Sequence, residues 1–165
     1  MSRGACSREE LAGLYERRFS MVYQICLVLR KSIPDAEDAA QTVFRKVMER
    51  TEPFRDPEHE KAWLIVTARN ECRNQLKHWW RTRRAGEELL DSLAWEQPRD
   101  GEIWEQVAGL PEPQRLVLYL HYYQGYTTGE ISDMLRENHS TVRSRLVQAR
   151  KKLKLKLEEE GYGQT

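Results

Sequence analysis

The sequence predicts an all-α protein made of two small helical domains that a linker joins. Apolar residues recur with the 3.6-residue period of an amphipathic helix along most of the chain. No segment combines β-branched residues with the alternating pattern of a strand. Residues 85–109 have weak periodicity and contain Pro98, Gly101 and Gly109, which are typical of a linker. We therefore expect domains at residues 8–84 and 110–159.

The composition is that of a soluble chain of 165 residues, with 39% hydrophobic and 32% charged residues. No stretch approaches the ~20 apolar residues of a membrane span, and the N-terminus lacks the apolar segment of a secretory signal. We expect a cytoplasmic protein without a membrane span. The three cysteines form no CxxC pair and share no repeated spacing with the four histidines, so neither a disulfide framework nor a zinc site is expected.

Two helices are predicted in the first fifty residues. The first is long and amphipathic, with Leu11, Leu14, Tyr15, Val22, Cys26 and Leu29 on its apolar side. Ser32 and Asp35, with Pro34 in the first turn, predict the start of the second. Its inner side is predicted to comprise Ala36, Ala39, Ala40, Val43, Phe44, Val47 and Met48.

A loop and a third helix complete the first domain. Pro53 and Pro57 bracket the loop TEPFRDPE, because proline is not tolerated inside a helix and biases its predecessor away from helix. The third helix is predicted from about His59 to Trp80, with Trp63 on one face.

The second domain is predicted to hold helices over residues 112–123, 128–136 and 140–159. Thr127 and Glu130 have the spacing of a capping box at the start of the middle helix. The middle helix directs Ile131 and Leu135 inward, and the last helix directs Val142, Leu146, Ala149 and Leu153 inward. A short capped helix, a tight turn and a longer helix are typical of a helix-turn-helix.

The net charge is only +1, but the charge is segregated along the chain. Residues 69–84 and 136–156 are basic, and residues 87–112 are acidic. Two basic surfaces around an acidic segment predict two modules that face nucleic acid. On the last helix, cations for phosphates and side chains that reach base edges are predicted to point outward. A charged face that is only solvated is the competing interpretation.

Three motifs resemble one protein family. Region 4 of bacterial sigma factors of the extracytoplasmic-function group is similar to the segment LPEPQRLVLYLHYYQGYTTGEISDMLRENHSTVRSRLVQARKKL. Region 2 of the same sigma-70 family is similar to IPDAEDAAQTVFRKV and to AWLIVTARNECRNQLKHWWRTRR. The resemblance covers about residues 8–158. The chain departs from the family pattern at Thr42, Asn74, Ser132 and Gln148.

The resemblance implies a promoter-specificity subunit without catalytic residues. Residues 8–84 would bind core RNA polymerase and melt the minus-10 element, residues 85–109 would link, and residues 110–159 would read the minus-35 element. Core polymerase binding is implied for Asp38 and Gln41, on the outer side of the second helix, and for Thr42, where the family usually has Glu. For Asp38 alone, interaction with the helix dipole is an equally good interpretation.

The resemblance also implies that the TEPFRDPE loop captures a base flipped out of the melted non-template strand. Unpaired DNA requires aromatic surfaces for stacking, cations for the backbone and polar groups for base edges. A core aromatic is the competing interpretation of Trp63. The implied minus-10 residues are Phe54, Arg55, Trp63, Arg69, Asn70, Asn74, Trp79, Trp80, Arg81, Arg83 and Arg84. The implied minus-35 residues, in contact with duplex DNA, are Ser140, Thr141, Arg143, Ser144, Arg145, Gln148, Arg150 and Lys151.

Two other classes of protein compete with this reading. A stand-alone helix-turn-helix regulator, with an N-terminal sensor or dimerisation domain, would not need the DAEDAAQ segment or single-strand-binding residues. A metal-dependent nuclease would need a convergent cluster, whereas Glu58, His59 and Glu60 point in different directions on a helix. We therefore expect no enzyme activity, no metal and no cofactor. The family further implies an anti-sigma factor as a partner; the alternative control is internal, with residues 87–112 folding onto residues 143–156.

Overall fold

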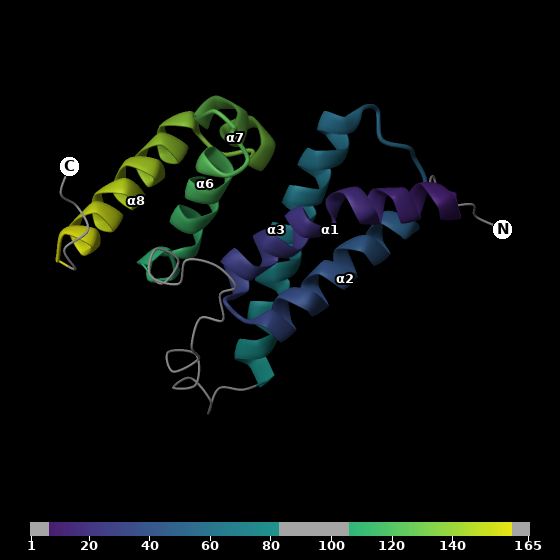
Figure 1. The fold of residues 1–165 in the computed structure, drawn as a ribbon, viewed down its shortest axis with the longest axis horizontal. Helices are drawn as coiled ribbons and strands as arrows, with labels where there is room; N and C mark the ends of the chain where they lie inside the picture. Colours follow the sequence, from purple (N-terminus) through teal and green to yellow (C-terminus); the bar gives the residue numbers. More distant parts are fainter. Residues whose placement is uncertain (1–6, 83–105, 160–165) are drawn as a thin grey trace. The chain divides into compact units, whose positions relative to one another are not determined.

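The structure is a computed structural model that describes residues 7–82 and 106–159. The chain divides into two compact units, residues 1–94 and residues 95–165, and each unit is described by itself. All regular secondary structure within the described ranges is helical (Figure 1), which confirms the predicted all-α class. The helices are α1 (Arg8–Arg30), α2 (Ile33–Glu49), α3 (Pro57–Thr82), α6 (Glu112–Tyr122), α7 (Thr128–Leu135) and α8 (His139–Glu159).

The first unit is a bundle in which α1, α2 and α3 all pack against one another. Ser7 caps α1 through a hydrogen bond from the Glu10 N–H to its hydroxyl (3.1 Å). Ser32 caps α2, as the sequence predicts, by accepting from the Asp35 N–H. Lys31 has a φ of 58°, a left-handed conformation that ends α1 and turns the chain into α2. The core is made by Leu14, Val22, Ile25, Ala36, Ala40, Val43, Val47, Leu64, Ile65 and Ala68.

The predicted inner side of α2 is correct except at its last residue. Met48 is 57% exposed, whereas the other six predicted positions are buried. Met48 follows Val47 by about 100° of helical rotation and lies in the last turn, so it is rotated out of the core. Tyr15 of α1 is also 37% exposed, because it lies at the edge of the bundle against the rings of Phe19 and Phe44.

Helix α3 begins at Pro57, two residues earlier than the sequence predicts. The Asp56 carboxylate accepts a hydrogen bond from the His59 N–H (2.7 Å), and the Asp56 carbonyl accepts from the Glu60 N–H (3.1 Å). Asp56 therefore caps the helix. Pro57 fits the first turn because the N–H that proline lacks has no intrahelical partner at that position.

The second unit contains the predicted helix-turn-helix, with α7 and α8 packed on each other and on α6. Thr127 and Glu130 form both hydrogen bonds of the capping box at the start of α7. Gly125, with a φ of 76°, occupies a conformation that favours glycine before α7. The core comprises Leu116, Val117, Leu120, Ile131, Leu135, Val142, Leu146 and Ala149.

The end of the predicted linker belongs to the second unit. Gln106, Val107 and Ala108 form a helical turn, and their side chains are buried. Arg115 of α6 is itself buried and donates a hydrogen bond to the Leu110 carbonyl, which ties this turn to the helix. Weak periodicity hid a short buried turn here, because one turn is too short to show a period. Residues 85–105, the rest of the expected linker, lie outside the described residues.

No helix among the described residues is long and apolar enough to cross a membrane. Cys26 and Cys72 are buried in the first unit, and they form no disulfide in the part of the chain that the structure describes.

Candidate nucleic-acid interface

The two aromatic residues predicted to bind a flipped base meet at the loop between α2 and α3. The ring centroids of Phe54 and Trp63 are 5.6 Å apart at an angle of 62°, and the His59 ring lies 5.5 Å from Phe54. Both Phe54 and Trp63 are half-buried. Trp63 is therefore neither a fully buried core residue nor a freely exposed one. It packs against Phe54, and we call this aromatic pair the loop site.

Arg50, the residue after α2, completes this cluster and was missed by the sequence analysis. Its guanidinium carbon lies 4.1 Å from the Phe54 ring centroid and 4.9 Å from the Trp63 ring centroid. Both distances are within the range of a cation–π interaction. The only sequence signal was a cation four residues before an aromatic residue. This spacing brings two side chains together only within a helix, and α2 ends before Arg50.

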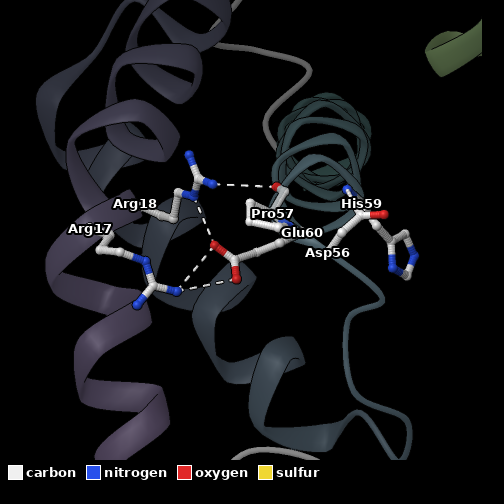
Figure 2. Close-up of polar contacts among 6 residues, drawn as sticks. All are labelled: Arg17, Arg18, Asp56, Pro57, His59 and Glu60. Carbon is white, nitrogen blue, oxygen red and sulfur yellow. Dashed lines mark hydrogen bonds and ion pairs between the residues drawn. The ribbon is translucent and has the colours of Figure 1, made fainter.

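Short polar contacts hold the end of the loop to the first turn of α3. The Arg55 N–H donates to His59 Nδ1 (3.1 Å), while the His59 N–H donates to the Asp56 carboxylate (2.7 Å). His59 therefore faces the loop, whereas Glu60 faces α1 (Figure 2). His59 and Glu60 thus point in different directions. In the described part of the chain, no group of three His, Cys, Asp or Glu side chains is placed to hold a metal ion.

Two arginines of α1 clamp Glu60, which is 12% exposed at its side chain. Arg17 Nη2 donates to both carboxylate oxygens (3.2 and 3.3 Å), and Arg18 Nε donates to one (2.8 Å). Arg18 also donates to the Pro57 carbonyl (3.3 Å). Figure 2 shows both arginines converging on the start of α3 from the neighbouring helix. This clamp, formed by Arg17, Arg18 and Glu60, fixes the first turn of α3, and hence the end of the loop, to α1.

The remaining candidates on α3 divide between two sides of the helix. Asn70, Asn74 and Arg81 are exposed and share a side with Trp63, because spacings of seven, four and seven return to the same side of a helix. Arg69 and Trp80 lie about 110° away around the axis. Arg69 donates to the Asn70 side-chain oxygen (3.2 Å), and Trp80 is 39% exposed beside Trp79, with ring centroids 5.4 Å apart.

The loop site and the tryptophan pair are distant from each other. Trp79 follows Trp63 by sixteen residues, which corresponds to about 24 Å of helix. The structure thus brings together Phe54 and Trp63 but not the whole predicted set. Arg55 is exposed at the loop. Arg83 and Arg84 lie outside the described residues.

The candidate polymerase-binding residues lie on the outer side of α2, as the sequence predicts. Asp38 and Gln41 are exposed, and the Asp38 carboxylate accepts a hydrogen bond from Gln75 Nε2 of α3 (2.9 Å). The Thr42 hydroxyl is half-buried; it donates to the Asp38 carbonyl (3.1 Å) and accepts from Arg45 (3.3 Å). Thr42 is therefore already satisfied within its own helix.

The candidate residues on α8 differ in exposure and in their contacts with the rest of the second unit. Ser140, Arg143, Ser144, Gln148, Arg150 and Lys151 are exposed, whereas Thr141 and Arg145 are half-buried. Arg145 forms an ion pair with Glu137 in the turn before α8. Gln148 accepts from Gln114 of α6 (3.1 Å), and Arg150 donates to the Tyr122 hydroxyl and lies over that ring.

Arg143 differs from these three, because its side chain makes no hydrogen bond or ion pair with any residue that the structure describes. The partners of Arg145, Gln148 and Arg150 are Glu137, Gln114 and Tyr122. The sequence analysis missed them because each lies on a different element, up to 34 residues away. Within the described residues, Arg143 is thus the arginine of α8 that has no internal side-chain contact to lose.

Comparison with known proteins matches both units to one family. The model described as "Sigma-70 region 2" matches residues 14–82, and the model described as "Sigma-70, region 4" matches residues 100–153. The RNA polymerase sigma factor SigV of Bacillus subtilis is 27% identical, over 84% of this chain and 85% of its own length. The ECF RNA polymerase sigma factor SigL of Mycobacterium tuberculosis is 28% identical, over 96% of each chain.

Two solved structures share the fold. The sigma factor RpoE of Bartonella quintana, in complex with the anti-sigma factor NepR, superposes with a TM-score of 0.74 at 20% identity, covering 89% of this chain and 96% of RpoE. CnrH, in complex with the cytosolic domain of CnrY, gives a TM-score of 0.66 at 21% identity, covering 96% and 94% of the two chains. The sigma-70 family is not a family of enzymes. The two-unit fold, the two matched regions and the relatives together show that this chain is an RNA polymerase sigma factor, a member of the extracytoplasmic-function group of the sigma-70 family.

Proposed function

We propose that this chain directs core RNA polymerase to its promoters by dividing the work between its two units. Residues 8–84 bind the polymerase and melt the minus-10 element, residues 85–109 join the units, and residues 110–159 read the minus-35 element. The observation that carries this proposal is the loop site of Phe54 and Trp63, because an aromatic pair beside cations suits an unpaired base. A regulator that binds only duplex DNA has no use for such a site.

Core polymerase binds the outer side of α2 through Asp38 and Gln41. The exposure of both residues supports this role, and the hydrogen bond from Gln75 gives the Asp38 carboxylate a defined direction. Thr42 contributes less, because its hydroxyl already has a donor and an acceptor within α2. In this assignment, the buried side of α2 still packs against α1 and α3. Polymerase binding therefore does not require the first unit to unfold.

The unpaired non-template strand runs from the loop along α3. The side of α3 that carries Trp63, Asn70, Asn74 and Arg81 offers, in order, a stacking surface, two amides for base edges and a cation for the backbone. Phe54 and Arg55 meet the strand at the loop. Arg69 and the Trp79–Trp80 pair lie on another side of α3, where they suit the duplex edge of the melted region, and Arg83 and Arg84 extend the same charge.

Helix α8 enters the major groove of the minus-35 element. Its N-terminal half carries Ser140, Thr141, Arg143 and Ser144, which is where a reading helix meets base edges. Arg145, Gln148, Arg150 and Lys151 follow, as phosphate ligands or as contacts that first exchange an internal partner. Arg143 is the main direct contact, since it has no described partner to give up.

An anti-sigma factor is the regulatory partner that we propose, and the cytoplasm, where polymerase works, is the proposed location. RpoE and CnrH were both solved with other chains, NepR and CnrY respectively, and both share this fold. Such a partner would cover the polymerase-binding side of α2. Internal control by residues 87–112 involves residues outside the described ranges and stays an alternative.

Run-off transcription tests the proposed function. Purified core polymerase, with and without the full chain, is supplied with a library of genomic fragments from the source bacterium. We expect discrete transcripts that begin only when the chain is present. A stand-alone regulator would instead bind duplex DNA without directing initiation by core polymerase, and that result would overturn the proposal.

A double variant then separates polymerase binding from DNA binding. Replacing Asp38 and Gln41 by Ala in the full chain is expected to weaken association with core polymerase. The same variant should bind minus-35 duplex with unchanged affinity, since both residues lie in the first unit. Retained core binding in the double variant would refute the role of α2.

A further inference from the structure

Arg50 has an unusual environment for an arginine that is only partly exposed. Its guanidinium lies over two aromatic rings, and its Nε atom is buried without a hydrogen-bond partner. No side-chain hydrogen bond or ion pair joins Arg50 to the residues that the structure describes. A cation–π interaction stabilises the charge of a guanidinium, but it does not satisfy its N–H donors.

Four other partly exposed or buried arginines of the described ranges donate to an oxygen acceptor, although Arg30 Nε, like Arg50 Nε, has no hydrogen-bond partner. Arg18 donates to Glu60, Arg30 to Asp35 and Arg145 to Glu137, so each of them has a carboxylate. Arg115, the most buried of them, donates to the Leu110 carbonyl. Arg50 thus differs from these four in that aromatic rings hold its guanidinium, which has no carboxylate or carbonyl partner among the described residues.

The position of Arg50 identifies what those donors are for. Arg50 is the residue after α2, directly before the loop that we assign to the unpaired strand, and it contacts both aromatic residues of that site. A base that stacks on Phe54 or Trp63 brings its own phosphodiester within the reach of a guanidinium already lying on the same rings. Arginine binds phosphate oxygens through two parallel N–H donors.

We propose that Arg50 binds a backbone phosphate of the unpaired non-template strand, next to the base held at the loop. This inference rests on the proposed function. It adds a specific ligand, one phosphodiester, and a division of labour in which Phe54 and Trp63 orient the guanidinium before DNA arrives. Arg50 is therefore a DNA-contacting residue of the loop site.

The test uses the full chain bound to core polymerase and a fluorescent single-stranded oligonucleotide. The oligonucleotide carries the non-template minus-10 region of a promoter found in the run-off assay, and its affinity is measured across a series of salt concentrations. Each phosphate neutralised on a single strand contributes about 0.7 to the slope of log affinity against log salt. Arg50→Met should therefore flatten the slope by about 0.7 and weaken binding by about tenfold at moderate salt.

Two variants control for the geometry of the guanidinium and for general charge. Arg50→Lys keeps a cation but cannot donate as a planar fork, so it should retain the slope while losing part of the affinity. Arg8→Met removes one exposed cation at the start of α1 and should bind as the wild type does. If Arg8→Met flattens the slope as much as Arg50→Met, general charge explains the effect and the proposal fails.

A scan of the oligonucleotide makes the test independent of whether Arg50→Met folds. Methylphosphonates, which are uncharged, replace the phosphates one at a time while the wild-type chain is kept. We expect one position at which neutralisation costs about as much as Arg50→Met, or as Arg50→Gln if the methionine variant does not fold. At that position, combining the Arg50 substitution with the methylphosphonate should reduce the affinity no further than either change does alone. Losses that multiply at every position would overturn the proposal.

Failure of this inference can be told apart from failure of the proposed function. If the wild-type complex does not bind the single strand at all, the assignment of the loop to unpaired DNA is wrong, and this inference falls with it. If it binds, but Arg50→Met has the wild-type slope, only the phosphate contact is refuted.

Discussion

The clamp between α1 and α3 provides the strongest prediction, because it connects packing to strand opening. Glu60→Gln removes the charge that Arg17 and Arg18 hold, while keeping the size of the side chain. The change does not touch Phe54, Trp63 or any residue assigned to DNA. We expect the first turn of α3 to open more often, and the loop that ends at Asp56 to lose its fixed position.

The magnitude follows from the two halves of the clamp. Arg17 is 58% exposed, so its ion pair is screened and contributes about 0.5 kcal/mol. Arg18 is 21% exposed and lies 2.8 Å from a carboxylate oxygen that is largely buried. Hydrogen bonds to charged groups of this kind contribute about 1.5–3 kcal/mol, and the glutamine keeps part of that through its carbonyl. We therefore expect a loss of about 1.5 kcal/mol in the local free energy of opening.

Hydrogen exchange of peptides from the start of α3 measures this loss in the full chain. It should be about tenfold faster in Glu60→Gln, because 1.4 kcal/mol corresponds to a factor of ten. Promoter opening is measured in parallel, with a fluorescent base at the minus-10 element and saturating holoenzyme. A loop that is disordered in the free protein must be ordered when DNA binds, which costs free energy. The extent of promoter opening should therefore fall in Glu60→Gln, by at most about tenfold.

Glu71→Gln is the matched control. Glu71 is 14% exposed, close to the 12% of Glu60, and it pairs with Lys46 of α2 at 3.1 Å in the same unit. Lys46 is 40% exposed, so this change should cost about 0.5 kcal/mol and leave promoter opening unchanged. Wild-type opening by Glu60→Gln, or an equal loss in both variants, would refute a positioning role for the clamp.

Three further predictions concern the other contacts. Arg143→Ala should weaken minus-35 duplex binding by about 1–3 kcal/mol. Arg145→Ala should weaken it less, because Arg145 must first leave its ion pair with Glu137. Fluorescence anisotropy titrations measure both affinities, and equal losses would contradict this order. Gln75→Leu should weaken core polymerase binding without changing duplex binding, because it removes the hydrogen bond that orients the Asp38 carboxylate. If a pull-down recovers as much core polymerase as the wild type does, this prediction is wrong. The capping box of α7 lowers the pKa of Glu130, through its hydrogen bond with the backbone of Thr127 and then with the Thr127 side chain. The Glu130 carboxylate therefore contributes stability above its pKa in the unfolded chain, and this contribution is lost as pH falls through its pKa in the folded chain. Glu130→Gln should abolish this pH dependence of stability, which a series of thermal unfolding measurements at different pH values would measure.

The helices were predictable from the sequence because their determinants are local. Ser32 accepts from the backbone three residues ahead, and Thr127 and Glu130 bond to each other across the same spacing. Such signals are read within one turn, so they do not depend on the rest of the fold. The errors arose where that local view was incomplete. Met48 continues the apolar period but lies beyond the end of the core, and Pro57 was assigned to the loop although it opens a helix.

The candidate site was predictable in its residue types but not in its pairings. The aromatic and polar side chains needed for unpaired DNA are evident around residues 54–81. What the sequence does not reveal is which of them meet. Arg17 and Arg18 lie more than forty residues before Glu60, and nothing in their local pattern predicts that they share a carboxylate. Long-range pairs of this kind depend on how α1 packs against α3, which hydrophobic periodicity alone does not determine.

In the proposed roles, Arg145 of α8 and Arg50 of the loop site are prepared for DNA in opposite ways, and this follows from what each unit is proposed to bind. Duplex DNA is met everywhere in a genome, and a reading helix with only free cations would bind all of it through phosphates. Pairing Arg145 with Glu137 means that this arginine gains from DNA only where the new contact exceeds the one it gives up, which favours correct sites over others. Unpaired DNA is met only after polymerase has reached a promoter. A site for it gains nothing from an internal carboxylate, and the guanidinium of Arg50, which lies on Phe54 and Trp63, has no described carboxylate partner to give up.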